Sequence, residues 1–347
     1  MKIAIFGAGS IGVYIGASLL AAGGDVVLVG RARMRERIAR NGVRLTDLQG
    51  RAQTLTAQQV PYAEDGAGLA SADLIVVAVK SADTVAAADA IAAHAKPSAL
   101  IISLQNGIGN ADTLRARLAG WTVLGGMVPF NVVQMEQGRF HRGTAGELMV
   151  EASPAIAPWH ALFKAAHLPL VERSDFAAVQ WGKLLLNLNN SVNALSGLPL
   201  KAELSQRSYR RSLALLIDEA LKVLRAAGIQ PAKVAGVAPH VLPMLLRLPD
   251  VLFKRVASAM LRIDPEARSS MWEDLQVGRR TEIDYLNGAV VTLAESLGRQ
   301  VPANRRIVEL IRAAEARQIG NFAGIALYRD LTCDAARHAP TSALVSS

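Results

Sequence analysis

The sequence predicts an N-terminal α/β domain with a mostly parallel, doubly wound sheet, followed by an all-α C-terminal domain. Short apolar runs of strand type alternate with segments of helical periodicity over residues 1–175. The first of these runs, residues 3–6, leads directly into a glycine-rich turn. From Phe176 onward the periodicity is almost entirely helical. We therefore expect two domains, 1–175 and 176–331, and a small, flexible polar tail over 332–347.

The composition favours a folded protein with no membrane-spanning segment. The 347 residues are 51% hydrophobic and 19% charged, which suits two folded domains. No apolar run reaches the ~20 residues of a membrane span, and the apolar N-terminus has the pattern of a first strand rather than a signal peptide. The single cysteine, Cys333, excludes an intrachain disulfide framework. The net charge of +9 is scattered and aromatic residues are few, so we expect no nucleic-acid or membrane partner and a cytoplasmic location.

The glycine-rich turn has the spacing G-x-G-x-x-G between a strand and a helix, the context of a dinucleotide-binding fingerprint. Gly7 permits the tight turn, Gly9 lets a pyrophosphate approach the backbone, and Gly12 lets the helix pack close to the strand. The amides at the start of the helix then meet the phosphates. The alternative is an ordinary strand–helix turn. The expected cofactor contacts are those of the whole turn: Gly7, Ala8, Gly9, Ser10, Ile11 and Gly12.

The end of the second strand, residues 25–30, predicts which dinucleotide is bound. An acidic residue usually stands here in proteins that prefer NAD, where it binds the ribose hydroxyls. This chain has Arg31 and, two residues later, Arg33. A guanidinium can hold a 2′-phosphate through two parallel charged hydrogen bonds, so we expect NADP(H), with Arg31 as the first ligand. The alternative is that both arginines are exposed loop charges.

Polar residues follow two further strands of the expected sheet. The apolar run 73–80 ends in Lys80, and the strand 99–104, which comes after a helix over 83–94, leads into Asn106. Ligands bind at the carboxyl ends of parallel strands, so both residues are expected to line the nicotinamide and substrate cleft. The alternative is that they are turn and capping residues.

The remaining elements complete the two domains. Residues 43–60 predict an inserted hairpin, and residues 140–151 a second antiparallel hairpin around Gly143 and Gly146. The other elements expected in the first domain are a strand over 123–127, a helix over 158–166 and a strand over 168–171. Helices in the second domain are expected over 176–195, 208–227, 268–297 (with a possible break) and 304–317.

The helix over 176–195 carries polar residues in an otherwise apolar sequence. Lys183, Asn187 and either Asn190 or Ser191 fall on one helical face. A buried lysine or amide is unfavourable unless it is paired, so this face indicates a ligand cleft. A hydrogen-bonded network between helices is the alternative. Asn189 lies well off this face.

A second group of polar residues includes Ser269, Ser270 and, further on, Glu282, which is expected to start a helix. Helix capping alone also favours a glutamate in a first turn. Together with the earlier stretches, these residues resemble the ketopantoate reductase (2-dehydropantoate 2-reductase) family over nearly the whole chain. The motifs that carry the resemblance are Gly7-x-Gly9-x-x-Gly12, Arg31, Val79-Lys80, Gln105-Asn106-Gly107, Trp181-x-Lys183-x3-Asn187, Ser269-Ser270-Met271-x2-Asp274 and Thr281-Glu282-Ile283-Asp284-x2-Asn287-Gly288.

The resemblance implies a Rossmann domain, a helical domain for substrate binding and dimerisation, and an active site without metal between them. The implied reaction is NADPH-dependent reduction of 2-dehydropantoate to (R)-pantoate, on the route to pantothenate and coenzyme A. By the family's pattern Lys183 is the general acid and Glu282 binds and orients a substrate hydroxyl. Other substrate contacts are implied for Asn106, Lys80, Asn187, Ser191 and Ser270, and Lys80 and Asn106 also lie near the cofactor.

One residue departs from the pattern. Many family members have an asparagine where this chain has Ser191, although Asn190 and Asn193 are close enough to substitute. We therefore keep a related reductase of another 2-keto acid as an alternative, and an NADP(H)-sensing protein as an alternative without catalysis. A hydroxyacyl or sugar-acid dehydrogenase, often with a catalytic histidine, is disfavoured because the six histidines lie outside the motifs. The chemistry itself is consistent, since a positioned ammonium can stabilise and protonate the alkoxide that hydride transfer forms.

Overall fold

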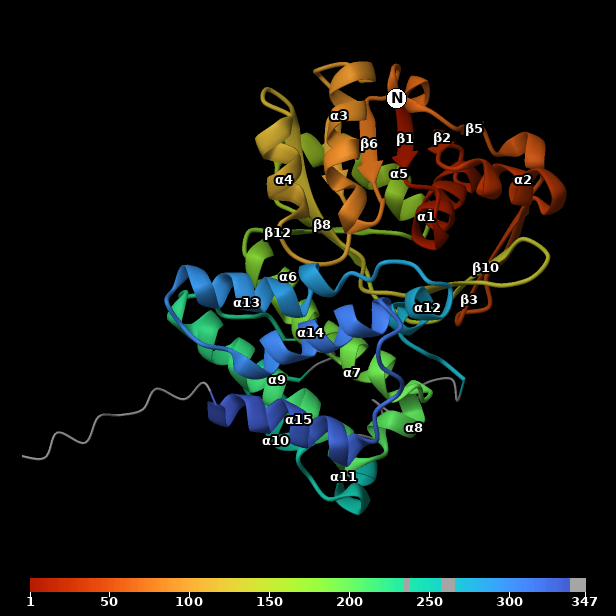
Figure 1. Cartoon of the computed structure of the whole chain (residues 1–347). Coiled ribbons are helices and arrows are strands. Elements are labelled where there is room, and N and C mark those ends of the chain that lie inside the picture. Colours follow the sequence, from red (N-terminus) through yellow and green to blue (C-terminus); the bar gives the residue numbers. More distant parts are fainter. Residues whose placement is uncertain (234–236, 257–265, 338–347) are drawn as a thin grey trace, which may run out of the picture. The chain divides into compact units, whose positions relative to one another are not determined.

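The computed structural model describes residues 1–233, 237–256 and 266–337, and the chain divides into two compact units, Met1–Phe176 and Ala177–Ser347 (Figure 1). The first unit is α/β and the described part of the second is helical, which confirms the predicted fold class. Within the described residues, no helix is both long enough and apolar enough to cross a bilayer.

The first unit is built on an eight-stranded sheet. In spatial order its strands are β12 (Leu170–Arg173), β11 (Leu148–Glu151), β8 (Thr122–Met127), β7 (Leu100–Ser103), β6 (Leu74–Val77), β1 (Lys2–Phe6), β2 (Asp25–Val29) and β5 (Tyr62–Ala63). All neighbouring strands are parallel except β11 and β8, which are antiparallel. The chain reverses its winding direction between β1 and β6, and the crevice at such a switch point is where doubly wound sheets bind ligands.

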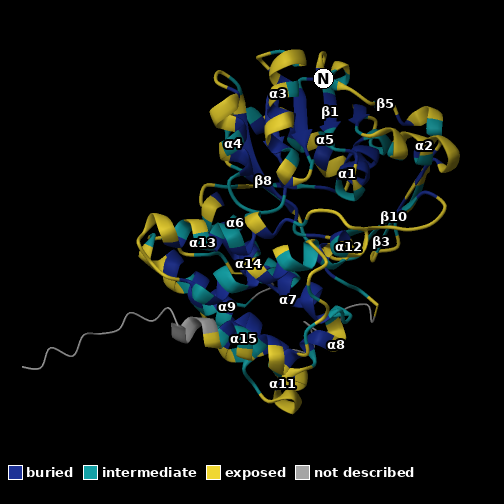
Figure 2. Ribbon diagram, in the orientation of Figure 1, coloured by how far each residue is buried: buried dark blue, intermediate teal, exposed yellow. Residues whose placement is uncertain are grey.

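Both faces of this sheet are buried, because successive residues of each strand point to opposite sides. Ile3 and Ile5 of β1 belong to one apolar cluster, whereas Ala4 belongs to a second cluster on the other face. Figure 2 shows the central strands as buried and the outer helix faces as exposed. The helices of this unit are α1 (Ser10–Ala21), α2 (Ala32–Asn41), α3 (Thr84–His94), α4 (Asn110–Arg117) and α5 (His160–Ala165), with 3-10 turns η1 (Ala57–Gln59), η2 (Gly66–Leu69), η3 (Ser81–Asp83) and η4 (Pro154–Trp159).

A second, four-stranded sheet packs against α1. Its strands, in spatial order, are β4 (Ala52–Leu55), β3 (Val43–Asp47), β10 (Arg139–Arg142) and β9 (Val132–Gln134). The β3–β4 pair is antiparallel, which confirms the predicted hairpin over 43–60. Helix α1 contacts strands of both sheets and is buried at every position from Gly12 to Leu19. The N-terminal helix is therefore held from two sides.

The predicted hairpin over 140–151 is wrong. Strands β10 and β11 belong to different sheets, and β10 pairs with β9 instead. The tight turn lies earlier in the chain, at Gln137 and Gly138, where both residues have positive φ. Gly146, also at positive φ, lies on the segment that carries the chain back to the large sheet. Gly143 and Gly146 therefore lie between two strands of different sheets and do not close a hairpin.

The second unit is an assembly of helices in which the long helix α9 contacts α7, α8, α10, α13, α14 and α15. Its helices are α6 (Phe176–Asn187), α7 (Asn189–Ser196), α8 (Leu200–Leu204), α9 (Arg207–Ala226), α10 (Leu242–Leu246), α11 (Asp250–Val256), α12 (Ser270–Gln276), α13 (Asn287–Ser296), α14 (Pro302–Glu315) and α15 (Gly324–Arg337), with η5 (Pro239–Val241) and η6 (Ile283–Tyr285).

Three expectations for this unit need correction. The helix over 176–195 is interrupted at Leu188, which lies between α6 and α7. Glu282 precedes only the short turn η6, and the regular helix α13 begins at Asn287. The start of the predicted tail, 332–337, belongs to α15, which is anchored by its fully buried residues Leu327 and Leu331. The rest of that tail lies outside the described residues.

Candidate functional site

The glycine turn after β1 has the geometry that a dinucleotide needs. A Cβ atom at Gly7 would lie 2.5 Å from the Ala78 carbonyl carbon, and one at Gly12 would lie 2.1 Å from the Gly7 oxygen. At Gly9, by contrast, a Cβ would meet no atom within 4 Å. Two of the glycines are therefore required by close internal packing, and the third faces open space at the start of α1. The first amides of a helix have no intrahelical partner, so a phosphate group fits there.

The loops after β6 and β7 are tied together by buried polar side chains. The Ser81 hydroxyl donates to the Asn106 carbonyl oxygen at 3.0 Å, and the Asn110 amide donates to that same oxygen at 2.6 Å. Thr84 donates to Asn110 at 2.8 Å, and Gln105 donates to Thr84 at 2.7 Å. The supporting role of these residues could not be predicted from the sequence, because short polar side chains in loops have no periodicity that indicates burial.

This network bears on the two predicted cleft residues of the first unit. Lys80 is exposed and stands just before η3, and Asn106 is half-buried in the loop after β7. Strands β6 and β7 are parallel neighbours, so the two residues follow the carboxyl ends of adjacent strands. Their loops are held by hydrogen bonds, which limits how far either residue can move.

Arg31 lies at the end of β2, as predicted, but it has a partner. Its guanidinium is 3.1 Å from the Asp83 carboxylate, and its side chain remains 84% exposed. The Tyr62 hydroxyl donates to the Arg31 carbonyl oxygen at 3.0 Å, which fixes the backbone at this position. Exposed ion pairs contribute little free energy, so an anionic ligand can compete with Asp83 for the guanidinium. Arg33 is exposed on α2.

Helices α6 and α7 carry the predicted polar face. Lys183, Asn187 and Asn190 are half-buried, whereas most of their neighbours along the chain are buried. Lys183 and Asn187 lie one turn apart on α6, whereas Asn190 lies on α7, beyond the interruption at Leu188. Ser191 is fully buried, and its hydroxyl donates to the Leu188 carbonyl oxygen at 2.9 Å. The two alternatives that the sequence left open therefore differ in exposure: Asn190 is half-buried and Ser191 is buried.

Lys183 and Glu282 come together within the helical unit, although 99 positions separate them in the sequence. Burial lowers the pKa of the Lys183 ammonium from 10.5 to about 8, and the negative charge of Glu282 opposes this shift. Glu282 itself is 9% exposed. A lysine whose pKa is lowered by burial and that interacts electrostatically with a buried carboxylate is a candidate for proton transfer.

The residues around Glu282 have structural partners. Thr281 donates its amide proton to the Glu315 carboxylate at 2.7 Å, and Asn287 is fully buried and donates to Asn304 at 3.1 Å. These two bonds fix the chain on both sides of Glu282, so part of that motif supports the carboxylate rather than a ligand.

The two serines of the Ser269-Ser270 pair also differ in role, one supporting the structure and the other being exposed. Ser269 is buried and caps α12 by accepting the Trp272 amide proton at 3.2 Å, whereas Ser270 is exposed. Asp274 is buried beside Arg279, with 3.4 Å between the charged groups. Ser270 is therefore the member of this motif that is available to a ligand.

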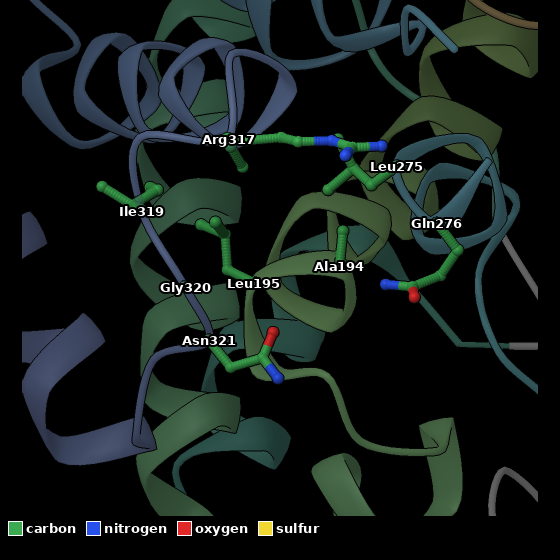
Figure 3. A pocket seen from close by; sticks show the side chains of 9 residues that line it. Ala194, Leu195, Leu275, Gln276, Arg317, Ile319, Gly320 and Asn321 are labelled. Carbon is green, nitrogen blue, oxygen red and sulfur yellow. The ribbon is translucent and has the colours of Figure 1, made fainter. Parts of the chain in front are cut away.

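A hollow of about 270 Å³ lies elsewhere in the helical unit (Figure 3). Its wall is formed by the C-terminal parts of α7 and α12 together with the end of α14 and the chain that follows it. The lining residues are Ala194, Leu195, Leu275, Gln276, Ala314, Arg317, Ile319, Gly320 and Asn321. None of the predicted site residues is among them. Within the described residues, no group of three or more His, Cys, Asp or Glu side chains is placed to hold a metal ion.

The sequence matches two family models. The model described as "Ketopantoate reductase PanE/ApbA" matches residues 3–154, and the model described as "Ketopantoate reductase PanE/ApbA C terminal" matches residues 175–315. A 2-dehydropantoate 2-reductase of Halobacterium salinarum is 29% identical over 324 residues, which cover 91% of this chain and 99% of that protein.

Comparison with solved structures also indicates similarity to ketopantoate reductases. A PanE/ApbA family ketopantoate reductase from Ralstonia eutropha JMP134 has a TM-score of 0.78 and 32% identity, covering 92% of this chain and 99% of that one. A D-mandelate dehydrogenase solved with NADH and anilino(oxo)acetate has a TM-score of 0.72 at 20% identity, covering 91% of this chain and 99% of that one. The second likeness is one of fold alone.

Proposed function

The chain belongs to the ketopantoate reductase family and is an oxidoreductase acting on a CH–OH group, and we propose that it reduces 2-dehydropantoate to (R)-pantoate with NADPH. The observation that carries the proposal is the Lys183–Glu282 pair, with the pKa of the lysine lowered to about 8. The named relatives support the choice of substrate. The place in pantothenate and coenzyme A synthesis and a cytoplasmic location belong to the same proposal.

The residues of the first unit fit a pyridine dinucleotide. The open space at Gly9 and the crowded backbone at Gly7 and Gly12 support binding of the pyrophosphate by residues 7–12. Arg31 would leave Asp83 and bind the 2′-phosphate, which makes NADP(H) the favoured cofactor. When it is bound, NADPH supplies the hydride. Lys80 and Asn106 would contact the nicotinamide ribose and the substrate.

Reduction of a ketone places negative charge on its oxygen. In the proposed mechanism the Lys183 ammonium donates a hydrogen bond to that oxygen, stabilises the charge and transfers a proton to it. A pKa near 8 keeps the lysine mostly protonated at neutral pH and still acidic enough to donate. Glu282 would accept a hydrogen bond from a substrate hydroxyl and thereby orient the substrate. Its charge also keeps Lys183 protonated.

The remaining polar groups would hold the substrate. Asn187 lies one helical turn from Lys183, and its amide would bind the substrate. Ser270 at the start of α12 would contribute a hydroxyl group. Ser191 is the weakest of the predicted contacts, because its hydroxyl is committed to Leu188. The half-buried Asn190 replaces it in our proposal. A homodimer is also part of the proposal, and a related ketopantoate reductase from Staphylococcus aureus is described as dimeric.

A reductase of another 2-keto acid is the second candidate. The observation that favours it is the buried serine at position 191, where many family members carry an asparagine that helps to hold the keto acid. The shape of the substrate that fits beside Lys183 therefore depends on Asn190.

The loss of NADPH absorbance tests both candidates. Purified protein is mixed with NADPH and 2-dehydropantoate, and in parallel with a panel of branched, aromatic and linear 2-keto acids. We expect the highest kcat/KM with 2-dehydropantoate. A higher kcat/KM with another keto acid favours the second candidate, and no oxidation of NADPH with any of them contradicts both.

A further inference from the structure

Asn193 lies at the junction between the helix that follows Lys183 and the segment that carries Ser270. Its side chain is fully buried on α7. Its Oδ1 atom accepts the Ser269 amide proton at 2.9 Å, and its Nδ2 atom donates to the Leu198 carbonyl oxygen at 3.0 Å. These two partners are backbone groups of fixed polarity, so the amide can take only one orientation, and Asn193 also hydrogen-bonds the Glu203 carboxyl group. Asn193 therefore cannot offer its side chain to a substrate, although the sequence allowed that role.

Three further hydrogen bonds hold the same junction. The Leu200 amide donates to the Ala267 carbonyl oxygen at 2.8 Å, and Arg268 donates to the Gly197 carbonyl oxygen at 2.6 Å. The Ser269 hydroxyl donates to the Asn190 carbonyl oxygen at 3.2 Å. Asn193 is the buried centre of this set, and its bond to Ser269 acts on the residue immediately before Ser270.

We propose that Asn193 is a positioning residue for substrate binding, which fixes the Ser269–Ser270 backbone against α7 and so sets where the Ser270 hydroxyl meets the substrate. The inference rests on the proposed function, in which Ser270 contacts the keto acid. Alternation of burial supports it, because Ser269 faces inward to Asn193 and Ser270 is exposed. Removing the amide leaves the buried Ser269 amide and the partly buried Leu198 carbonyl group without this partner and loosens this one turn.

Asn189 provides a matched control on the same helix. It is also a buried asparagine, 8% exposed, and its amide donates to the Glu203 carboxyl group at 3.0 Å. Both asparagines therefore contact Glu203 of α8, but of the two it is Asn193 that also bonds the Ser269–Ser270 segment. Asn189→Ala should therefore lower the melting temperature as Asn193→Ala does, without the same effect on substrate binding.

The kinetic test compares these variants in the full chain at saturating NADPH. We expect Asn193→Ala to raise KM for the keto acid about tenfold, to change kcat less than about threefold, and to leave KM for NADPH unchanged. Asn189→Ala should leave all three near wild type. Asn193→Asp keeps an acceptor oxygen for the Ser269 amide, so its KM should lie close to wild type even where its melting temperature falls. Equal KM changes in Asn193→Ala and Asn189→Ala would overturn the proposal.

A double-mutant cycle tests whether Asn193 acts through Ser270. In a Ser270→Ala background, Asn193→Ala should raise KM by less than about twofold more, because the contact that it positions is already absent. If the two effects multiply instead, Asn193 does not act through Ser270 and the inference fails.

Hydrogen exchange separates this inference from the proposed function. If the wild-type protein reduces no keto acid, the proposed function fails, but the positioning of Ser269 is still measurable. We expect the peptide containing Ser269 and Ser270 to exchange faster in Asn193→Ala than in wild type or Asn189→Ala. Equal exchange in the two alanine variants would show that Asn193 does not hold this turn.

Discussion

The two units place their polar groups in different ways. Among the described residues, the buried polar side chains of the first unit are all uncharged, and those tied to the predicted site support the loops after β6 and β7. The second unit buries ionisable side chains among its helices. These residues are Glu203, Arg210, Glu219, Asp274 and Glu282.

This difference is consistent with a division of the proposed function, in which the first unit binds the cofactor and the second transfers the proton. Binding of a pyrophosphate depends on how closely backbone amides can approach the phosphates. The first unit therefore relies on glycines and on the start of a helix more than on ionisable side chains. Proton transfer near neutral pH is favoured by a shifted pKa, and removal of water from an ionisable group is the largest cause of the shift at Lys183. The helical unit supplies that environment, at a cost in stability for each buried charge. The following predictions test this division, from the largest expected effect to the smallest.

Replacing the lysine should separate catalysis from folding. Lys183→Met removes the proposed general acid and should lower kcat by about 10³-fold while NADPH still binds, because acid catalysis of this kind contributes about 10² to 10⁴. The same variant should melt at a higher temperature at pH 7, since it removes a charged group whose pKa is lowered by burial. Differential scanning fluorimetry and stopped-flow absorbance measure the two effects, with the exposed Lys201→Met as control. Near-normal turnover in Lys183→Met would exclude the lysine as the acid.

The pH dependence should carry the signature of the same group. The acid must be protonated, so kcat for reduction should fall as the pH rises through about 8. Glu282 raises the pKa of Lys183, so Glu282→Gln should move this fall to lower pH. The stability of the wild type should increase between about 8 and 10.5, because there the unfolded lysine binds more protons than the folded one. A pH profile of kcat that is flat from pH 7 to 10 would contradict the assignment.

Two glycines should respond to alanine in opposite ways. Gly9→Ala places a methyl group in open space, so the protein should fold normally and bind NADPH about 10- to 100-fold more weakly. Gly12→Ala places the methyl group 2.1 Å from the Gly7 oxygen, so it should destabilise the unit itself. Urea unfolding and NADPH fluorescence titration distinguish the two. Unchanged affinity in Gly9→Ala would place the pyrophosphate elsewhere.

The arginine after β2 should affect one cofactor only. Arg31→Ala should weaken NADPH about tenfold and leave NADH unchanged, because only NADPH carries the 2′-phosphate. Asp83→Asn removes the present partner of Arg31 and should strengthen NADPH by about two- to fivefold. Isothermal titration with both nucleotides measures these shifts. Equal losses for NADPH and NADH would mean that Arg31 only shapes the loop.

The smallest effect on the proposed activity is expected for a buried carboxyl group outside the proposed mechanism. Burial raises the pKa of Glu203 from 4.5 to about 8, although Asn189, Asn193 and Arg210 oppose the shift. Between these values the folded group holds a proton that the unfolded group has lost, so stability should fall as pH rises, by up to about 1.4 kcal/mol per unit. Glu203→Gln should flatten urea midpoints measured from pH 5 to 8, whereas the exposed Glu136→Gln should not.

The sequence predicted the elements that follow a simple pattern. Strand β1, the glycine turn and helix α1 combine a change of periodicity with fixed glycine spacing, so fold class and turn could be recognised together. The shared helical face of Lys183 and Asn187 was also visible, because helical spacing is regular. The pairing of β10 with β9 was missed, since Gln137 carries no sequence sign of its positive φ.

Partners that are distant in the chain were beyond sequence reasoning. Nothing around Asp83 indicates that it meets Arg31, and no spacing rule connects Asn193 with Ser269. Ser191 is buried and the adjacent Asn190 is half-buried, and helical spacing from the sequence did not distinguish the two positions. The individual candidate residues could therefore be predicted from the sequence, whereas their hydrogen-bond and ion-pair partners could be identified only in the structure.

The second sheet has a thermodynamic consequence for ligand capture. Helix α1 is enclosed between two sheets, so its first turn is pre-organised before any nucleotide arrives. Association should then carry only a small entropic penalty for ordering this turn, and the heat of binding should arise mainly from phosphate contacts. A change in β3, β4, β9 or β10 that loosens the helix would weaken nucleotide affinity entropically, without altering a single atom that touches the ligand.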